Sequence, residues 1–170
     1  MITVTLAYLE YVKKNHLLKD LSEPELQLIL EATTPCDFQA DEIIMHEGDA
    51  GEAMYIMCDG SVAITKRLTL ELSEEAPREK TMIRFRAEQG VILGEMALIE
   101  SDVRSATVTA LTPCLMLELT KEKFYLLLKQ YPEVGVKILL RLAQSLSQRL
   151  RKASDELVKV TTALAIALES

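Results

Sequence analysis

One short segment of the chain combines residue types that suit a small anionic ligand. Within residues 90–108, Gly94 and Glu95 stand on a short apolar turn, and Arg104 follows nine residues after the glutamate. Gly94 leaves room for a ligand to approach the backbone. The turn GEMAL would start a short helix, whose first N–H groups favour a negative charge. A guanidinium group at Arg104 would add a full charge and two parallel donors that match phosphate oxygens.

Glu95 sets a second condition on such a ligand, because a carboxylate beside a bound anion is repelled unless it accepts hydrogen bonds. A small phosphate ester with a free sugar hydroxyl suits both Glu95 and Arg104. Charge-assisted hydrogen bonds of this kind contribute about 1.5–3 kcal/mol each where water is excluded. The residues alone leave a purely structural alternative open, in which Glu95 caps the turn and Arg104 is its salt-bridge partner.

The composition excludes several other classes of protein. With 170 residues, 49% of them hydrophobic and 26% charged, the chain is long enough to bury its own core. A net charge of −7 disfavours a general nucleic-acid binder. Cys36, Cys58 and Cys114 are widely spaced and odd in number, which is typical of free thiols in a reducing compartment. His16 and His46 lie too far apart in the sequence for a metal motif.

The elements that position this segment fall into three zones. Residues 1–33 and 120–170 have helical patterns, whereas residues 34–119 alternate short Val/Ile/Thr-rich runs with Gly, Asp and Ser. We therefore expect an α+β, mainly β protein: an antiparallel jelly-roll flanked by N-terminal helices and a long C-terminal helix. The predicted strands are Cys36–Gln39, Glu42–Glu47, Ala53–Cys58, Ser61–Leu68, Thr81–Arg86, Ser105–Ala110 and Cys114–Leu119.

Two connections within the strand zone have clear signals. Asp59-Gly60 between the third and fourth runs predicts a two-residue hairpin. The polar stretch LSEEAPREK, from Leu72 to Lys80, predicts a solvated loop.

The C-terminal helix is predicted to run from Pro132 to Leu168 and to carry the clearest periodicity. Its apolar seam comprises Leu139, Ala143, Leu146, Leu150, Ala153, Leu157, Val160, Leu164 and Ala167. These steps of four and three make about four heptads. The helix would be about 55 Å long, more than a small domain can cover, so we expect a homodimer through residues 139–167. The longest apolar run near either end, Ala163–Leu168, is too short to span a membrane. Together with the free thiols, this predicts a soluble, cytoplasmic protein.

The stretch Gly94-Glu95-Met96-Ala97-Leu98, followed by Arg104-Ser105-Ala106, resembles the phosphate-binding cassette of the cyclic-nucleotide-binding domain family. The segments HEGDAG at 46–51, MYI at 54–56 and DGSV at 59–62 resemble the first hairpins of that family. The likeness covers roughly residues 17–157. The chain departs from the family pattern at Asp41, where a glycine is frequent, and at Leu93, where a phenylalanine is frequent; neither change affects the polar residues of the cassette.

The resemblance implies a role for each matching position. Glu95 would accept the ribose 2′-hydroxyl, and Arg104 would pair with the exocyclic oxygens of the cyclic phosphate. The backbone at Met96 and Ala97 would complete the phosphate site, and Ser105 would add a hydroxyl near the phosphate or the base.

The remaining implied roles concern packing and the base. Leu98 and Ala106 would pack closely around the ligand, and residues 91–93 (Val91, Ile92, Leu93) would help to line the pocket. In dimeric members the long helix lies over the base, which makes Ser154 a candidate base contact. The match of Arg-Ser-Ala to cAMP-binding bacterial regulators favours cAMP, with cGMP as the alternative.

The family likeness predicts a binding module rather than an enzyme: a cyclic-nucleotide sensor that acts through its C-terminal helices on an unknown effector protein. It needs no cofactor or metal, and we expect no direct nucleic-acid contact because LVKVTTALAIALES at the end of the chain only prolongs the helix. A dimeric scaffold that does not respond to nucleotide is the second hypothesis. A cupin-type metalloenzyme would need several histidines, and His46 alone does not supply them.

Overall fold

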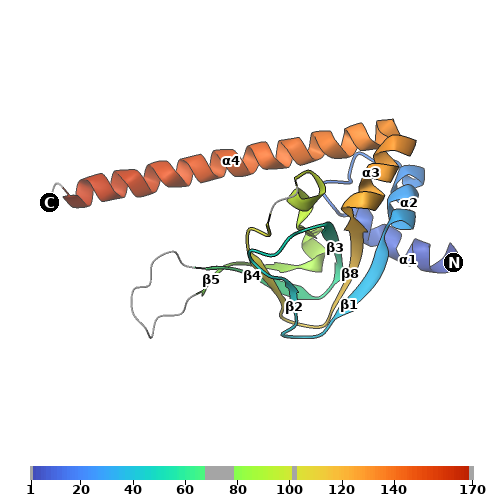
Figure 1. Cartoon of the computed structure of the whole chain (residues 1–170), viewed down its shortest axis with the longest axis horizontal. Helices are drawn as coiled ribbons and strands as arrows, with labels where there is room; N and C mark the ends of the chain where they lie inside the picture. The colour runs from blue at the N-terminus through green and yellow to red at the C-terminus, as the bar shows by residue number, and fades with distance from the viewer. Residues whose placement is uncertain (1, 68–78, 101–102, 169–170) are drawn as a thin grey trace.

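The computed structural model describes residues 2–67, 79–100 and 103–168 of the chain. A β-roll lies against two N-terminal helices, and one long helix passes over the roll and extends well beyond it (Figure 1). The predicted loop over 72–80 lies mostly outside the described residues, and Glu79 and Lys80 already belong to a strand.

In the described part of the chain, eight strands form two four-stranded antiparallel sheets, which confirms the predicted fold class. One sheet has the order β1-β8-β3-β6 and the other has the order β2-β7-β4-β5. The strands are β1 (Thr34–Phe38), β2 (Ile43–Met45), β3 (Ala53–Asp59), β4 (Ser61–Arg67), β5 (Glu79–Arg86), β6 (Ile92–Leu93), β7 (Thr107–Ala110) and β8 (Cys114–Thr120). The two-residue strand β6 was not predicted, because so short an element has no periodicity.

The Asp59-Gly60 turn exists, but the hairpin predicted across it is wrong. β3 pairs with β6 and β8, whereas β4 pairs with β5 and β7, so the turn carries the chain from one sheet to the other. Gly60 has a φ of 93°, and a Cβ there would lie 2.5 Å from the carbonyl oxygen of Pro113. The turn between β7 and β8 is thus packed against the Asp59-Gly60 turn. At both turns the chain crosses from one sheet to the other, so the two crossings lie at the same place.

Two buried clusters hold the parts together. One fills the interior of the roll and includes Met57, Val62 and Met116. The other joins the outer face of the roll to the helices and includes Ile29, Phe124 and Ile138. The site described below lies where these two clusters approach each other.

The helices are α1 (Ile2–Lys13), α2 (Glu23–Ala32), α3 (Lys121–Gln130) and α4 (Pro132–Leu168). Side-chain hydrogen bonds cap the beginnings of α3 and α2. The hydroxyl of Thr120 accepts a hydrogen bond from the backbone N–H of Lys123 at 3.3 Å, and the carboxylate of Glu25 accepts one from the N–H of Ser22 at 2.7 Å. Two single 3-10 turns, η1 (Ala87–Gln89) and η2 (Glu95–Leu98), flank β6.

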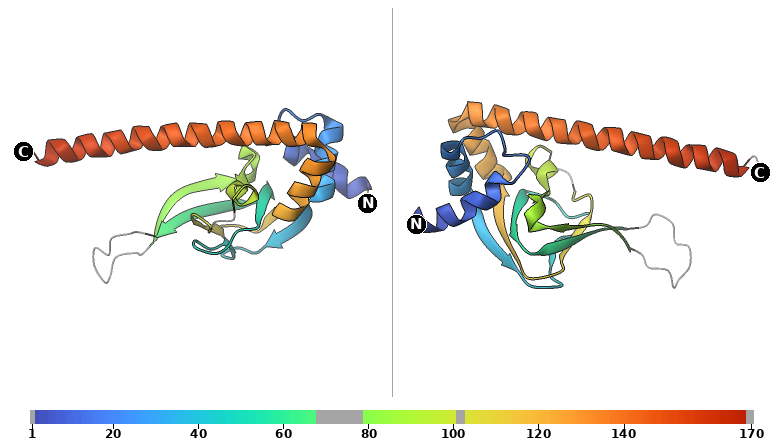
Figure 2. Two further views of the ribbon diagram at one scale, coloured as in Figure 1. Left: turned by 45° about the horizontal axis from the view of Figure 1, so that its top comes forward. Right: turned by 180° about the vertical axis from the view of Figure 1, so that it is seen from behind.

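Helix α4 has two apolar stripes with different surroundings. Val134, Ile138 and Leu142 are buried against the rest of the chain. The predicted seam is exposed where it continues along the helix, and every side chain from Ser147 to Leu168 is exposed. This part of the helix extends beyond the roll (Figure 2). Among the described residues, no helix is both long enough and apolar enough to cross a membrane.

Candidate functional site

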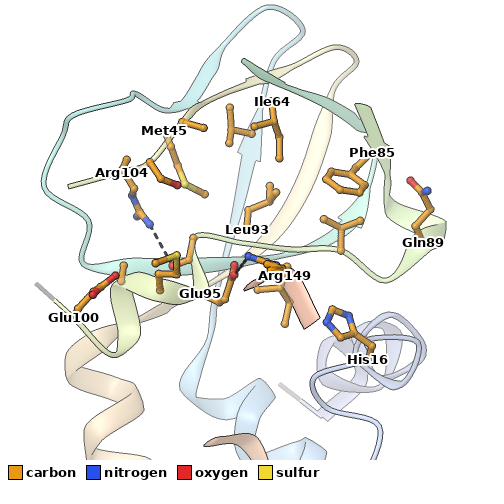
Figure 3. Close-up of a pocket in the computed structure, with 18 of the residues that line it drawn as sticks. His16, Met45, Ile64, Phe85, Gln89, Leu93, Glu95, Glu100, Arg104 and Arg149 are labelled. Carbon is orange, nitrogen blue, oxygen red and sulfur yellow. Dashed lines mark hydrogen bonds and ion pairs between the residues drawn. The ribbon is translucent and has the colours of Figure 1, made fainter. Parts of the chain in front are cut away.

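A cavity of about 540 Å³ opens between the roll and α4. Its walls come from β2, β4, β5 and β7, from the stretch η1-β6-η2, from α4 and from the segment after α1 (Figure 3). The volume falls within the range of small-molecule sites. Ile64, Phe85 and Leu93 make an apolar wall, while Glu95 and Arg104 bring opposite charges to the same space.

Gly94 holds the turn that places these charges. Its φ of 71° is left-handed, and a Cβ there would lie 2.3 Å from a guanidinium nitrogen of Arg104. The predicted short helix is the single turn η2, in which the N–H of Ala97 donates to the carbonyl oxygen of Gly94 at 3.1 Å. The phosphate contacts expected from the backbone of Met96 and Ala97 stay predictions.

Arg104 is held by backbone carbonyl groups rather than by a carboxylate. Its guanidinium donates to the carbonyl oxygen of Ala53 at 2.7 Å and to that of Gly94 at 3.4 Å. The side chain passes over Gly51, where a Cβ would lie 2.8 Å from Nε. Carbonyl groups orient the cation without neutralising it, so its charge is left for an anion.

A second hollow, of about 700 Å³, lies on the other side of Arg104 and contains Tyr55 and Glu118 in its lining. The Tyr55 hydroxyl donates to the Glu118 carboxylate at 2.8 Å. Burial, and to a smaller extent this hydrogen bond, raises the pKa of Tyr55 to about 12. Burial lowers the pKa of the Arg104 guanidinium, and the neighbouring Tyr55 and Glu118 oppose that shift. The Glu118 carboxylate therefore offsets part of the cost of burying the Arg104 charge.

Glu95 is only 7% exposed and pairs with a residue that the sequence did not point to. Its carboxylate accepts a short hydrogen bond from the guanidinium of Arg149 on α4 (Figure 3). The Arg149 side chain keeps 55% of its surface exposed. No ion pair joins Glu95 to Arg104 among the described residues, so the salt-bridge alternative considered for these two residues is wrong.

Most of the predicted site residues line this one cavity. They are Val91, Ile92, Leu93, Gly94, Glu95, Met96, Ala97, Arg104, Ser105 and Ala106.

Two predicted residues lie elsewhere in the described chain. Leu98 is 1% exposed and packs in the cluster between roll and helices, because η2 turns its side chain toward α3 and away from the cavity. Ser154 is exposed on α4, and its hydroxyl donates to the carbonyl oxygen of Leu150 at 2.9 Å. A base contact by Ser154 from a second copy stays a prediction.

The cavity also contains residues that the sequence analysis missed, among them His16, Phe85, Gln89 and Arg149. His16 and Arg149 come from parts of the chain far from the cassette, whereas Phe85 and Gln89 lie shortly before it, and no local motif marks any of them. Arg149 does stand off the apolar seam of α4, which is the one sequence signal that favoured a polar role. No group of three or more His, Cys, Asp or Glu in the described part of the chain is placed to hold a metal ion.

The comparison with protein-family models identifies the family. Residues 35–131, more than half of the chain, match the model described as "Cyclic nucleotide-binding domain". The chain belongs to this family. The matched range includes η2 and Arg104, which line the cavity described above.

Individual relatives agree with the family. The chain is 31% identical over 139 residues to the cAMP-activated global transcriptional regulator CRP of Salmonella typhimurium; this match covers 81% of the chain and 60% of the regulator. The structure superposes on the catabolite activator protein of Thermus thermophilus with a TM-score of 0.74 and 26% identity, covering 86% of the chain and 63% of that protein. A cyclic nucleotide-binding domain from Methylobacillus flagellatus gives a TM-score of 0.74 and 28% identity, with 92% and 83% coverage. The chain thus spans about 60% of the length of the regulator it matches.

Proposed function

We propose that the chain is a sensor module that binds a 3′,5′-cyclic nucleotide, with cAMP preferred over cGMP, in the cavity of about 540 Å³. The observation that supports this most is that Glu95 and Arg104 line the same cavity without neutralising each other. A ligand with a phosphate for Arg104 and a hydroxyl for Glu95 satisfies both groups. The name of the Salmonella relative, a cAMP-activated regulator, agrees with this ligand class.

Each cassette residue then has a task. Arg104 holds the exocyclic phosphate oxygens, and Glu95 accepts the ribose 2′-hydroxyl. Ser105 and Ala106 lie beside Arg104 in the lining, where a hydroxyl reaches the phosphate and a small side chain leaves room for it. The apolar wall around Phe85 and Leu93 covers the base.

Ligand occupancy reaches α4 through Arg149. This residue joins α4 to the Glu95 carboxylate, which is the group that takes the ribose hydroxyl. The hydroxyl of a bound ribose either displaces Arg149 from the Glu95 carboxylate or donates to the carboxylate alongside it. Either outcome changes the strength of the contact that holds α4 against η2. A second state of this helix is therefore favoured or disfavoured by the nucleotide, and an effector protein reads the difference.

The exposed seam of α4 is proposed to be covered by a second copy of the chain. Leu150 and Leu157 are 69% and 64% exposed, and the heptad pattern continues to Ala167. Because α4 already buries another stripe against its own domain, the seam needs a separate partner. A parallel pair would also bring Ser154 of one copy close to the site of the other.

Calorimetric titration of the purified chain with cAMP and cGMP tests the proposal. We expect saturable binding, and at least about 30-fold weaker binding for Arg104→Ala and Glu95→Ala, because each leaves a buried polar ligand group unpaired. Arg151→Ala, which removes an exposed arginine of α4, is the matched control and should bind normally. A scaffold that does not respond to nucleotide predicts no binding heat up to millimolar ligand, and that result would contradict the proposal.

A further inference from the structure

The segment that follows α1 is fixed against the cavity wall by one buried polar side chain. Asn15 is fully buried, and its amide nitrogen donates to the carbonyl oxygen of Gly90 at 2.7 Å. Its amide oxygen accepts from the N–H of Leu17 at 2.9 Å. Both ends of the amide group are thus used: the nitrogen joins the N-terminal segment to Gly90, two residues before β6, and the oxygen holds the segment's own backbone.

The backbone contact at this point is equally close. Gly90 has a φ of 64°, and a Cβ there would lie 2.4 Å from the carbonyl oxygen of Lys14. Leu17 and Leu18 are buried in the helical cluster directly after the asparagine. Residues 14–18 therefore have a defined position relative to Gly90 and Val91, which line the cavity.

This arrangement places His16 in the lining of the cavity. Its neighbours Asn15 and Leu17 are buried, whereas the His16 side chain is exposed and is part of the cavity lining. Within residues 2–67, 79–100 and 103–168, no hydrogen bond or ion pair engages its ring. The amide oxygen of nearby Gln89, by contrast, already accepts from the N–H of Arg86 at 2.7 Å.

The position of His16 relative to the charged residues indicates what it meets. In Figure 3, Arg104 lies at one end of the cavity, Glu95 and Arg149 lie near its middle, and His16 lies beyond them at the other end. A cyclic nucleotide with its phosphate at Arg104 and its ribose at Glu95 has only its base left to extend past Glu95. The base therefore extends along the apolar wall toward His16.

We propose that the His16 imidazole contacts the purine base of the bound nucleotide and contributes to the choice between adenine and guanine. This inference rests on the proposed function. An imidazole ring offers one donor and one acceptor when neutral, and it also stacks on a purine. Adenine and guanine present different donors and acceptors along the edge that faces outward, so an imidazole carried on a fixed backbone segment distinguishes them.

Three ligands and three variants test this role by calorimetry: cAMP, cGMP and the base-free ribose 3′,5′-cyclic phosphate, with His16→Ala, His16→Gln and the control Lys19→Ala. Lys19 is exposed on the same segment and does not line the cavity. For His16→Ala we expect cAMP affinity to fall about three- to tenfold, the loss of one neutral hydrogen bond. The base-free ligand should bind as in the wild type, the ratio of cAMP to cGMP affinity should change, and His16→Gln should recover part of the loss.

Two results would overturn the role of His16 while leaving the proposed function in place. One is unchanged affinity of His16→Ala for both nucleotides. The other is an equal loss for cAMP and the base-free ligand, which would mean that His16 only supports the shape of the cavity. If the wild-type chain binds none of the three ligands, the proposed function fails, and this inference fails with it.

Discussion

The Glu95 carboxylate of η2 accepts a hydrogen bond from the Arg149 guanidinium of α4, across 54 residues of sequence. This pair joins the cassette to the long helix at the place where a ribose hydroxyl is expected. It makes the ligand site and the proposed output element neighbours, with no intervening layer of protein. The proposed coupling between ligand binding and the position of α4 therefore acts through one carboxylate.

Removing Arg149 should weaken both the stability of the chain and its response. For Arg149→Ala we expect a loss of about 1–2 kcal/mol, since a buried carboxylate loses a charged donor while the arginine itself is half exposed. Chemical denaturation of Arg149→Ala, Glu95→Gln and the double variant measures the coupling between the two residues. Additive losses would show that the pair is energetically irrelevant.

The same variant should uncouple α4 from the ligand. In the wild-type chain, we expect cAMP to change the hydrogen-exchange rates of backbone amides near residue 149. In Arg149→Ala this change should be much smaller, even at saturating cAMP. An identical response in both proteins would assign transmission to another contact.

Gly94 and Gly48 form a matched pair that separates backbone strain from the space needed by Arg104. Both have left-handed φ angles, 71° and 92°, but a Cβ at Gly48 meets nothing within 4 Å, whereas one at Gly94 meets Arg104. Each alanine variant should lose about 1–2 kcal/mol of stability from the backbone alone. Because the end of the Arg104 side chain must move, only Gly94→Ala should lose nucleotide affinity, by about tenfold or more. Equal affinities in a titration of the two variants would count against the placement of the phosphate at Arg104.

The coiled-coil proposal predicts a change of oligomeric state from single substitutions. Leu157→Asp places a charge in the exposed seam of α4 and should convert a dimer to a monomer in sedimentation equilibrium. Lys152→Asp, off the seam but on the same exposed part of the helix, should stay dimeric. A monomeric wild-type chain at micromolar concentration would contradict the proposed pairing.

A further measurement concerns the attachment of α2 to α4. The Lys137 ammonium, 2.7 Å from Glu25, and the N–H of Ser22 hold the pKa of the Glu25 carboxyl at about 2, below its usual value near 4.5. Because the folded pKa is the lower one, this stabilisation is complete above about pH 4.5 and is lost as the pH falls toward 2.

The pH dependence of stability checks this attachment. Lys137→Ala should be less stable than the wild type by about 1 kcal/mol or less near neutral pH, because Lys137 stays 42% exposed. The difference should shrink as the pH falls from 4.5 toward 2. A difference that stays constant over this range would show that Lys137 acts through packing alone.

The sequence was sufficient for the elements with long patterns. Pro132 and the heptads of α4 predicted the observed helix Pro132–Leu168. The cassette residues around Gly94 were found because a turn, a carboxylate and an arginine lie close together in sequence.

Contacts between segments that are distant in the sequence could not be predicted from it. The Asp59-Gly60 turn has the sequence typical of a hairpin, yet the two strands that it connects pair with strands of different sheets. Leu98 was assigned to the ligand, but one 3-10 turn is enough to direct it into the helical core. His16 and Arg149 reach the cavity only through the packing of Asn15 on Gly90 and of α4 on the roll.

The most direct measurement of the central claim is the electron density in this cavity in crystals of the chain grown or soaked with cAMP. The account predicts a bound nucleotide with its phosphate at the Arg104 guanidinium and its ribose hydroxyl at the Glu95 carboxylate. A cavity without nucleotide density at saturating cAMP, or a nucleotide bound elsewhere with these two side chains unengaged, would contradict it.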